Sequence, residues 1–198
     1  MVERGARDRG RVIVAGFEPF GGRQENRSWQ VVQALPDDLA VERVQLPVDF
    51  VALQTLVPAL VARRPRTLVL LGEASGTDAL QVERVALNVV HARIADNRDA
   101  RPVLAEVVPG APLARYARWD AAALVDTLVD AGVPAQISHH AGTYACNAAL
   151  YLALHTAATA SDPDDVPTTL GFVHVPVTSP PETSAIAAGI ARLLLTFR

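Results

Sequence analysis

Two residue types are scarce or absent in this chain of 198 residues: cysteine occurs once, as Cys146, and lysine does not occur. A single cysteine excludes a disulfide bond within the chain and is typical of a reducing compartment, so we expect a cytoplasmic protein. The absence of lysine excludes catalysis through a Schiff base or a lysine base. No Cys/His spacing resembles that of a structural zinc site, so we expect no such metal site.

Long apolar runs are also missing. No segment approaches the roughly 18 apolar residues of a membrane-spanning helix. Residues 1–8 are charged and lack the apolar core of a signal peptide. The net charge of −3 and the pI of about 5.9 give no reason to expect binding to nucleic acid or to an anionic membrane.

Half of the residues are hydrophobic, which is enough for one substantial core. We predict a single domain over residues 1–198, with a flexible N-terminus over residues 1–10. Short β-branched runs alternate with helical patterns along the chain. Strands are expected at 11–16, 41–46, 66–71, 82–90, 134–138 and 169–175, and helices at 28–35, 50–62, 119–131, about 146–155 and 182–197.

This alternation predicts a three-layer α/β/α sandwich with a mostly parallel, twisted central sheet. Ser28 is the expected N-cap of the first helix. Ligands of such folds bind outside the carboxyl ends of the strands. The loops expected there are 17–27, 72–78, 141–146 and the stretch after His174.

Cys146 is expected at the start of a helix, after a short strand and a bend that contains Gly142. The positive end of a helix dipole stabilises a thiolate, so the lone thiol is a candidate nucleophile. The segment alone leaves open a second interpretation, a buried structural thiol that packs as a small hydrophobe.

A cysteine nucleophile needs an imidazole to activate it and a group to orient that imidazole. His174 closes an apolar strand and is a candidate base, although it could equally be a partly exposed histidine at a strand end. Glu83 lies in an apolar stretch, where a structural pair with Arg84 is the alternative. His139 and His140 are rival bases because they lie close to Cys146 in the sequence.

Four blocks of sequence, in order along the chain, carry a family resemblance. The chain resembles the pyrrolidone-carboxyl peptidases, also called pyroglutamyl peptidases I, a family of cysteine peptidases. The blocks are Gly16-Phe17-Glu18-Pro19-Phe20-Gly21-Gly22 with Asn26 and Ser28-Trp29, Glu83-Arg84-Val85-Ala86-Leu87-Asn88 with Ala92-Arg93-Ile94-Ala95-Asp96-Asn97, Ala141-Gly142-Thr143-Tyr144-Ala145-Cys146-Asn147, and Gly171-Phe172-Val173-His174-Val175-Pro176.

The resemblance implies removal of N-terminal pyroglutamate from small peptides through a thioester, without a cofactor. It implies that Cys146 is the nucleophile, His174 the general base and acid, and Glu83 the residue that orients His174. Arg93 would lie near the oxyanion. The residues implied to bind substrate are Phe17, Phe20, Asn26, Glu73, Arg93, Tyr144 and Ala145. The resemblance also suggests a homo-oligomer, a dimer or a tetramer.

The chain departs from the family pattern at several positions. Glu73 stands where the family has Gln, and Ser75 and Thr77 stand where it has Gly and Arg. Arg27 replaces Pro, and Ala145 replaces a larger apolar residue. An unpaired carboxylate at Glu73 would disfavour a nearby thiolate. Two alternatives follow: a cysteine hydrolase for another small cyclic or blocked amide, and a catalytically inactive homologue that acts as a binding module.

Overall fold

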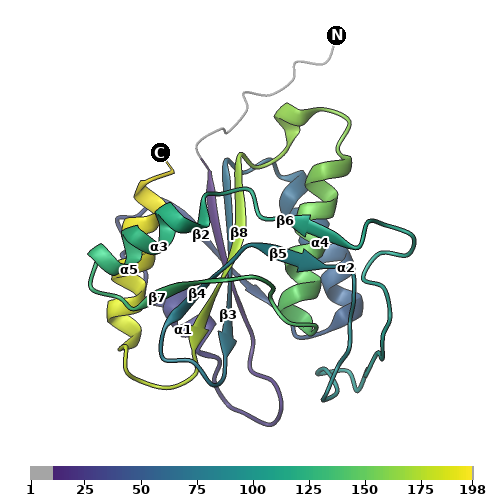
Figure 1. Ribbon diagram of the computed structural model, residues 1–198, viewed down its shortest axis with the longest axis horizontal. Helices are drawn as coiled ribbons and strands as arrows, with labels where there is room; N and C mark the ends of the chain where they lie inside the picture. Colours follow the sequence, from purple (N-terminus) through teal and green to yellow (C-terminus); the bar gives the residue numbers. More distant parts are fainter. Residues whose placement is uncertain (1–10, 198) are drawn as a thin grey trace.

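The computed structural model describes residues 11–197. The apolar runs predicted as strands form one six-stranded sheet (Figure 1), because β-branched and leucine side chains suit strands that are covered on both faces. The strands lie in the order β2-β1-β3-β8-β4-β7. Their bounds are β1 Val12–Phe17, β2 Val41–Leu46, β3 Thr67–Ala74, β4 Leu80–Glu83, β7 Ala135–Ser138 and β8 Thr169–Pro176.

The sheet is mixed but mostly parallel. Strands β1, β2, β3 and β8 run in one direction, and β4 pairs with β8 in the opposite direction. Strand β7 runs parallel to β4. The reversal lets the last residue of β4, Glu83, lie beside the strand that carries His174.

Helices cover both faces of this sheet (Figure 1). Helices α2 (Phe50–Ala62) and α4 (Ala145–Thr159) pack on one face, and α1 (Arg27–Gln33), α3 (Ala121–Asp130) and α5 (Thr183–Leu195) pack on the other. Each face has its own cluster of buried apolar side chains. The predicted α/β/α sandwich is therefore confirmed, and α2 spans the predicted residues 50–62 with Pro58 inside it.

Three local predictions were wrong. The stretch 82–90 is two strands, β4 and β5 (Val85–Leu87), and β5 forms a separate two-stranded sheet with β6 (Ala114–Tyr116), which the sequence did not reveal. The predicted 72–78 loop begins three residues too early, because β3 continues to Ala74. The N-cap of α1 is Asn26 rather than Ser28; the Asn26 side chain accepts from the Ser28 backbone N–H.

Helix α4 extends to Thr159, beyond its expected end near residue 155, and a short 3-10 helix, η1 (Pro163–Asp165), follows it. Within residues 11–197, no helix is long and apolar enough to cross a membrane. The expectations of a flexible segment over residues 1–10 and of a charged start without a signal peptide lie outside the described residues.

Candidate active site

Glu83 and His174 form a buried, hydrogen-bonded pair. The side chain of Glu83 is fully buried, and His174 is 7% exposed. His174 Nδ1 lies 2.7 Å from Glu83 Oε1. The indole N–H of Trp119 donates to the backbone carbonyl of Glu83 at 3.1 Å and fixes the strand end that carries the carboxylate. Glu83 thus pairs with His174 rather than with the exposed Arg84.

Cys146 is the second residue of α4 and lies half-buried above the end of β3. Gly72 makes this position possible. A Cβ on Gly72 would lie 2.7 Å from Cys146 Sγ and 2.6 Å from the Phe172 ring, closer than real Cβ atoms come to such neighbours. Gly72 is also the β3 partner of His174 in the strand register. A glycine therefore brings the thiol, β3 and β8 together.

The imidazole of His174 is hydrogen-bonded to Glu83 and interacts with Cys146. Burial alone would lower the pKa of His174. The negative charge of Cys146, the hydrogen bonds to Cys146 and Glu83, and the charge of Glu83 act in the opposite direction and raise this pKa to about 9. Because Nδ1 faces Glu83, Nε2 is the nitrogen left for the sulfur. This arrangement holds an imidazolium next to the sulfur of Cys146 at neutral pH.

The rival bases His139 and His140 are both exposed. His140 lines the cleft, and its Nδ1 accepts from the Gly142 backbone N–H at 3.1 Å. The structure brings His174, and neither rival, into contact with Cys146 and Glu83.

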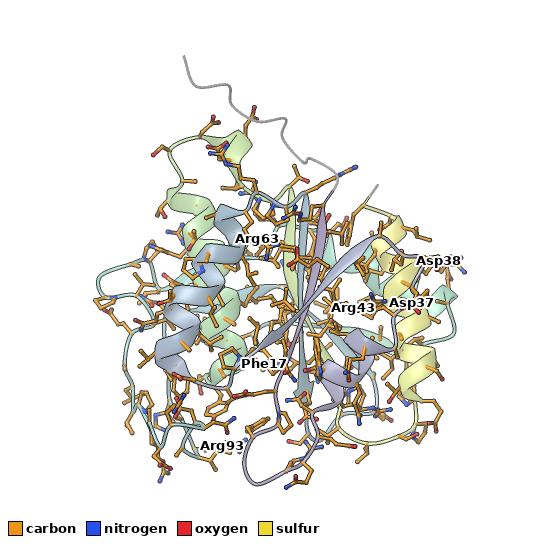
Figure 2. The ribbon with its side chains drawn as sticks, turned by 180° about the vertical axis from the view of Figure 1, so that it is seen from behind. Phe17, Asp37, Asp38, Arg43, Arg63 and Arg93 are labelled. Carbon is orange, nitrogen blue, oxygen red and sulfur yellow. The ribbon has the colours of Figure 1, made fainter. Side chains whose placement is uncertain are left out.

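A cleft of about 1100 Å³ opens in front of these three side chains. A narrow pocket continues from the cleft at Cys146. All of the residues expected to bind substrate line this pocket except Arg93. Arg93 is exposed and lines the cleft instead (Figure 2). These pocket residues are Phe17, Phe20, Asn26, Glu73, Tyr144 and Ala145.

Aromatic rings form the wall of the narrow pocket. The Tyr144 ring lies 5.8 Å from that of Phe20 and packs edge-on against Phe50 at 5.3 Å, measured between ring centroids. The Tyr144 hydroxyl donates to the Ala95 carbonyl at 2.9 Å. Burial, then the charges of Asp96 and Cys146, raise the pKa of Tyr144 to about 12. Tyr144 is therefore uncharged, and its hydroxyl hydrogen is already donated to the Ala95 carbonyl.

The contacts of Asn26 are structural. It is 3% exposed, caps α1, and donates to the Glu18 carbonyl at 3.0 Å.

Within residues 11–197, no three His, Cys, Asp or Glu side chains are grouped so as to hold a metal ion.

Comparison with known proteins agrees with this geometry. A family model described as pyroglutamyl peptidase matches residues 10–193. The chain belongs to the pyroglutamyl peptidase family. A pyrrolidone-carboxylate peptidase of Thermococcus kodakarensis is 41% identical over 170 residues, which cover 84% of this chain and 81% of that protein.

Solved structures of the family share the fold. A mutant pyrrolidone carboxyl peptidase from P. furiosus superposes with a TM-score of 0.85 at 29% identity, covering 94% of this chain and 97% of that chain. The pyroglutamyl peptidase I from Bacillus amyloliquefaciens gives a TM-score of 0.84 at 28% identity, covering 94% of each chain. These matches confirm the family that the four sequence blocks indicated.

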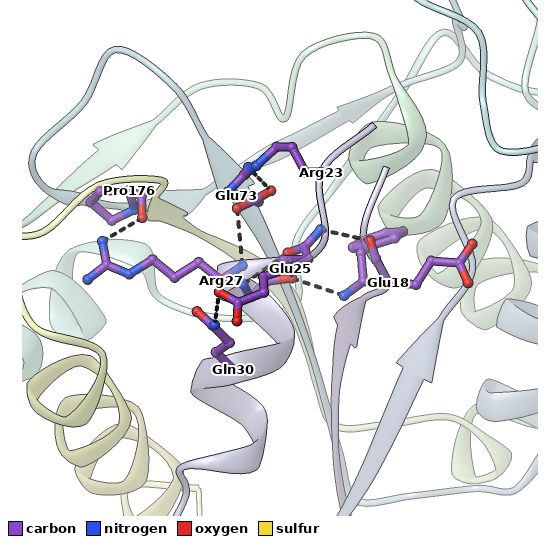
Figure 3. A network of polar contacts seen from close by, with 10 residues as sticks. Glu18, Arg23, Glu25, Arg27, Gln30, Glu73 and Pro176 are labelled. Atoms are coloured by element: carbon purple, nitrogen blue, oxygen red, sulfur yellow. Dashed lines mark hydrogen bonds and ion pairs between the residues drawn. The ribbon is translucent and has the colours of Figure 1, made fainter. Parts of the chain in front are cut away.

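Glu73, the departure in the family's glutamine position, is not an unpaired carboxylate. Its side chain is 2% exposed, and its Oε1 lies 2.5 Å from the guanidinium of Arg23. Its Oε2 accepts from the Arg27 backbone N–H at 3.1 Å (Figure 3). Proline has no N–H, so the arginine at position 27 supplies a donor that the family's usual residue lacks. The change to arginine at position 27 thus supplies a hydrogen-bond donor for the carboxylate that the change to Glu73 introduces.

The side chain of Arg27 reaches across to the segment that follows β8. It donates to the carbonyls of Pro176 at 2.9 Å, of Thr178 and of Pro181. Arg27 is 5% exposed, and burial lowers its pKa while the charges of Glu182 and Glu73 raise it. Arg27 therefore fastens the chain immediately after the strand of His174.

The other departures are local. The Thr77 hydroxyl donates to the Ala79 carbonyl at 2.9 Å within a tight turn. Ser75 lines the cleft, and Ala145 lies buried in the narrow pocket.

Sequence reasoning missed three contributors to the site: Arg23, Gly72 and Trp119. Gly72 and Trp119 act through contacts between segments distant in sequence, which no local pattern reveals. Arg23 follows two glycines in the first family block, a weak sign of an exposed tip that carries a charge.

Proposed function

We propose that this protein removes N-terminal pyroglutamate from peptides through an acyl-enzyme on Cys146. His174 acts as general acid and base, and Glu83 orients His174 and stabilises its charged form. The observation that supports this proposal is the contact of one buried imidazole with both Cys146 and Glu83, at the mouth of an aromatic pocket.

The first half-reaction begins with attack of the Cys146 thiolate on the pyroglutamyl carbonyl carbon. Helix α4 starts without a side-chain cap, so its first backbone N–H groups are available to the oxyanion. Arg93 adds a positive charge from the cleft side. The imidazolium of His174 then gives its Nε2 proton to the leaving amine, the C–N bond breaks, and a thioester remains.

The second half-reaction hydrolyses that thioester. Neutral His174 takes a proton from water, whose oxygen attacks the thioester carbonyl. The C–S bond breaks, pyroglutamate leaves, and the thiolate and imidazolium are restored. Glu83 keeps its charge throughout and holds Nδ1–H in place.

Selectivity arises from the narrow pocket. Pyroglutamate is a flat, neutral lactam, which suits the faces of Phe20 and Tyr144. Polar groups that pair with the lactam N–H and C=O would be left unpaired by proline, which lacks the ring carbonyl, and this penalises proline. The alternatives raised by Glu73 lose their main support, because its carboxylate is paired with Arg23.

The test is release of a fluorogenic amine from its pyroglutamyl conjugate. The prolyl conjugate controls for the lactam, and Cys146→Ser and His174→Ala control for the mechanism. We expect cleavage of the pyroglutamyl compound alone, and its loss in both variants with the fold retained. Equal cleavage of both conjugates, or full activity in Cys146→Ser, would contradict the proposal.

We further propose a cytoplasmic homo-oligomer, a dimer or a tetramer. A single free thiol suits a reducing compartment. Large apolar side chains that are mostly exposed on one stretch support self-association: Val103, Leu104, Leu113 and Tyr116.

A further inference from the structure

A tight turn at residues 20–23, the Phe20 turn, forms one wall of the site. Gly21 and Gly22 have φ angles of 61° and 77°, which glycine adopts without strain. The Arg23 backbone N–H closes the turn on the Phe20 carbonyl at 3.2 Å. Residues 21–23 are exposed, whereas Phe20 is half-buried and lines both the cleft and the narrow pocket.

The stem of this loop is well fastened. Asn97 donates to the Pro19 carbonyl at 2.9 Å, and Asn26 donates to the Glu18 carbonyl at 3.0 Å. The tip of the loop, residues 20–24, has fewer polar contacts than the stem. Among the described residues, the Arg23–Glu73 ion pair is the polar contact that ties residues 20–24 to another segment, since the remaining hydrogen bond of these residues is internal to the turn.

The two partners differ in burial. The Arg23 side chain is 45% exposed, and that of Glu73 is 2% exposed. Glu73 lies on β3, one residue after Gly72, so it is fixed by the sheet and by the Arg27 N–H (Figure 3). A buried carboxylate without its cation is costly, so the attraction favours the position of the turn in which Arg23 reaches Glu73.

We propose that Arg23 and Glu73 form a latch that positions Phe20 and thereby sets how tightly the narrow pocket binds the ring of the substrate. Both are positioning residues that act through the Phe20 ring. This inference rests on the proposed function for its kinetic readout. Its structural readout is independent of any activity.

The kinetic expectation is a rise in KM without a matching fall in kcat. Phe20 contacts the ring in the ground state and in the transition state alike, so a displaced Phe20 removes uniform binding. We expect Arg23→Ala to raise KM for the pyroglutamyl substrate about tenfold, as for a lost hydrogen bond to a charged group, and to leave kcat within about threefold. Arg23→Lys, which keeps the charge, restores most of the loss.

The coupling between the partners is tested with Glu73→Gln. Arg23→Ala alone leaves a buried carboxylate without its cation, and the double variant Arg23→Ala/Glu73→Gln removes that charge. We therefore expect the double variant to be no worse in KM than Arg23→Ala. Additive losses of the two single variants would show that the residues act separately and would overturn the latch.

Arg63→Ala is the matched control. The Arg63 side chain is 39% exposed, close to the 45% of Arg23, and it pairs with Glu42, which is 34% exposed, at the opposite end of the sheet (Figure 2). We expect this variant to have wild-type KM and kcat. An equal rise in KM in Arg63→Ala would overturn the latch, because it would show a general effect of removing a surface ion pair.

Hydrogen exchange separates failure of the latch from failure of the proposed function. In Arg23→Ala, exchange of the amide at position 23, which donates to the Phe20 carbonyl, should accelerate relative to wild type, with β2 unchanged. An inactive wild type together with this acceleration would overturn the proposed function and support the latch as a structural element. An active wild type whose kinetics and exchange are unchanged in Arg23→Ala would overturn the latch.

Discussion

At the scale of the residue, His174 is held in its charged form against the effect of burial. Desolvation lowers its pKa, whereas Cys146 and Glu83 raise it to about 9. Protonation of the leaving amine needs the charged imidazole, so the rate should fall as pH rises through the pKa of His174. The alkaline limb of the activity profile therefore reports on the pKa of His174, which Cys146 raises most and Glu83 raises further.

Glu83→Gln should move this alkaline limb to lower pH. Glutamine keeps an acceptor for Nδ1–H but removes the negative charge, which is one of the causes that raise the pKa of His174. The measurement is kcat/KM from neutral pH to above 9. Activity at neutral pH should persist at a reduced level, unlike in Cys146→Ser. A limb in the same place as in the wild type would show that Glu83 does not set the charge of His174.

Gly72→Ala tests the space under the thiol. A new Cβ would meet Cys146 Sγ and the Phe172 ring at distances that neither can tolerate without moving. We expect kcat to fall about a hundredfold or more, since a misplacement of about 1 Å has such an effect. The rate of thiol alkylation should change with it, while the unfolding midpoint reports the stability cost. Wild-type kcat in a folded Gly72→Ala protein would contradict the placement of Cys146.

At the scale of the element, Arg27 joins the start of α1 to the segment that leaves β8. Arg27→Ala leaves three carbonyls without their hydrogen-bond donor. It should therefore lower the free energy of unfolding by about 2–4 kcal/mol. Because the freed segment contributes Val177 and Thr178 to the cleft, KM should rise as well. Urea unfolding and steady-state kinetics measure the two effects.

Arg43→Ala controls for the loss of an arginine that binds carbonyls. The Arg43 side chain donates to the carbonyls of Val32, Leu35 and Pro36, at the end of α1 away from the cleft. This variant should lose stability without a change in KM. If both variants change KM equally, Arg27 has no specific effect on the cleft.

The elements were predictable where a pattern was local. Runs such as 66–71 indicated buried strands, and the block around Cys146 indicated the start of a helix. The split of 82–90 was not predictable, because its two halves pair with different partners: β4 with β7 and β8, and β5 with β6. The Arg23–Glu73 contact spans 50 residues of sequence and likewise has no local sign.

At the scale of the whole molecule, the reversal of β4 and β7 assembles the site. A fully parallel sheet would carry the end of every strand to one edge. Here Glu83 comes from a strand antiparallel to β8, while Cys146 comes from the helix after β7. Glu83 therefore approaches His174 from a strand that runs opposite to β8, a reversal that the sequence did not reveal.

Self-association is the remaining property at this scale, and Leu113→Asp tests it. Leu113 is 82% exposed, so a charge there should leave the fold intact, yet it would be buried in an interface formed by this stretch. We expect the wild type to have the mass of a dimer or tetramer by light scattering and Leu113→Asp to have a smaller mass. Val51→Asp, 74% exposed on α2, is the control and should not dissociate. A monomeric wild type would contradict self-association, and an oligomer disrupted by Val51→Asp but not by Leu113→Asp would place the interface on α2 instead.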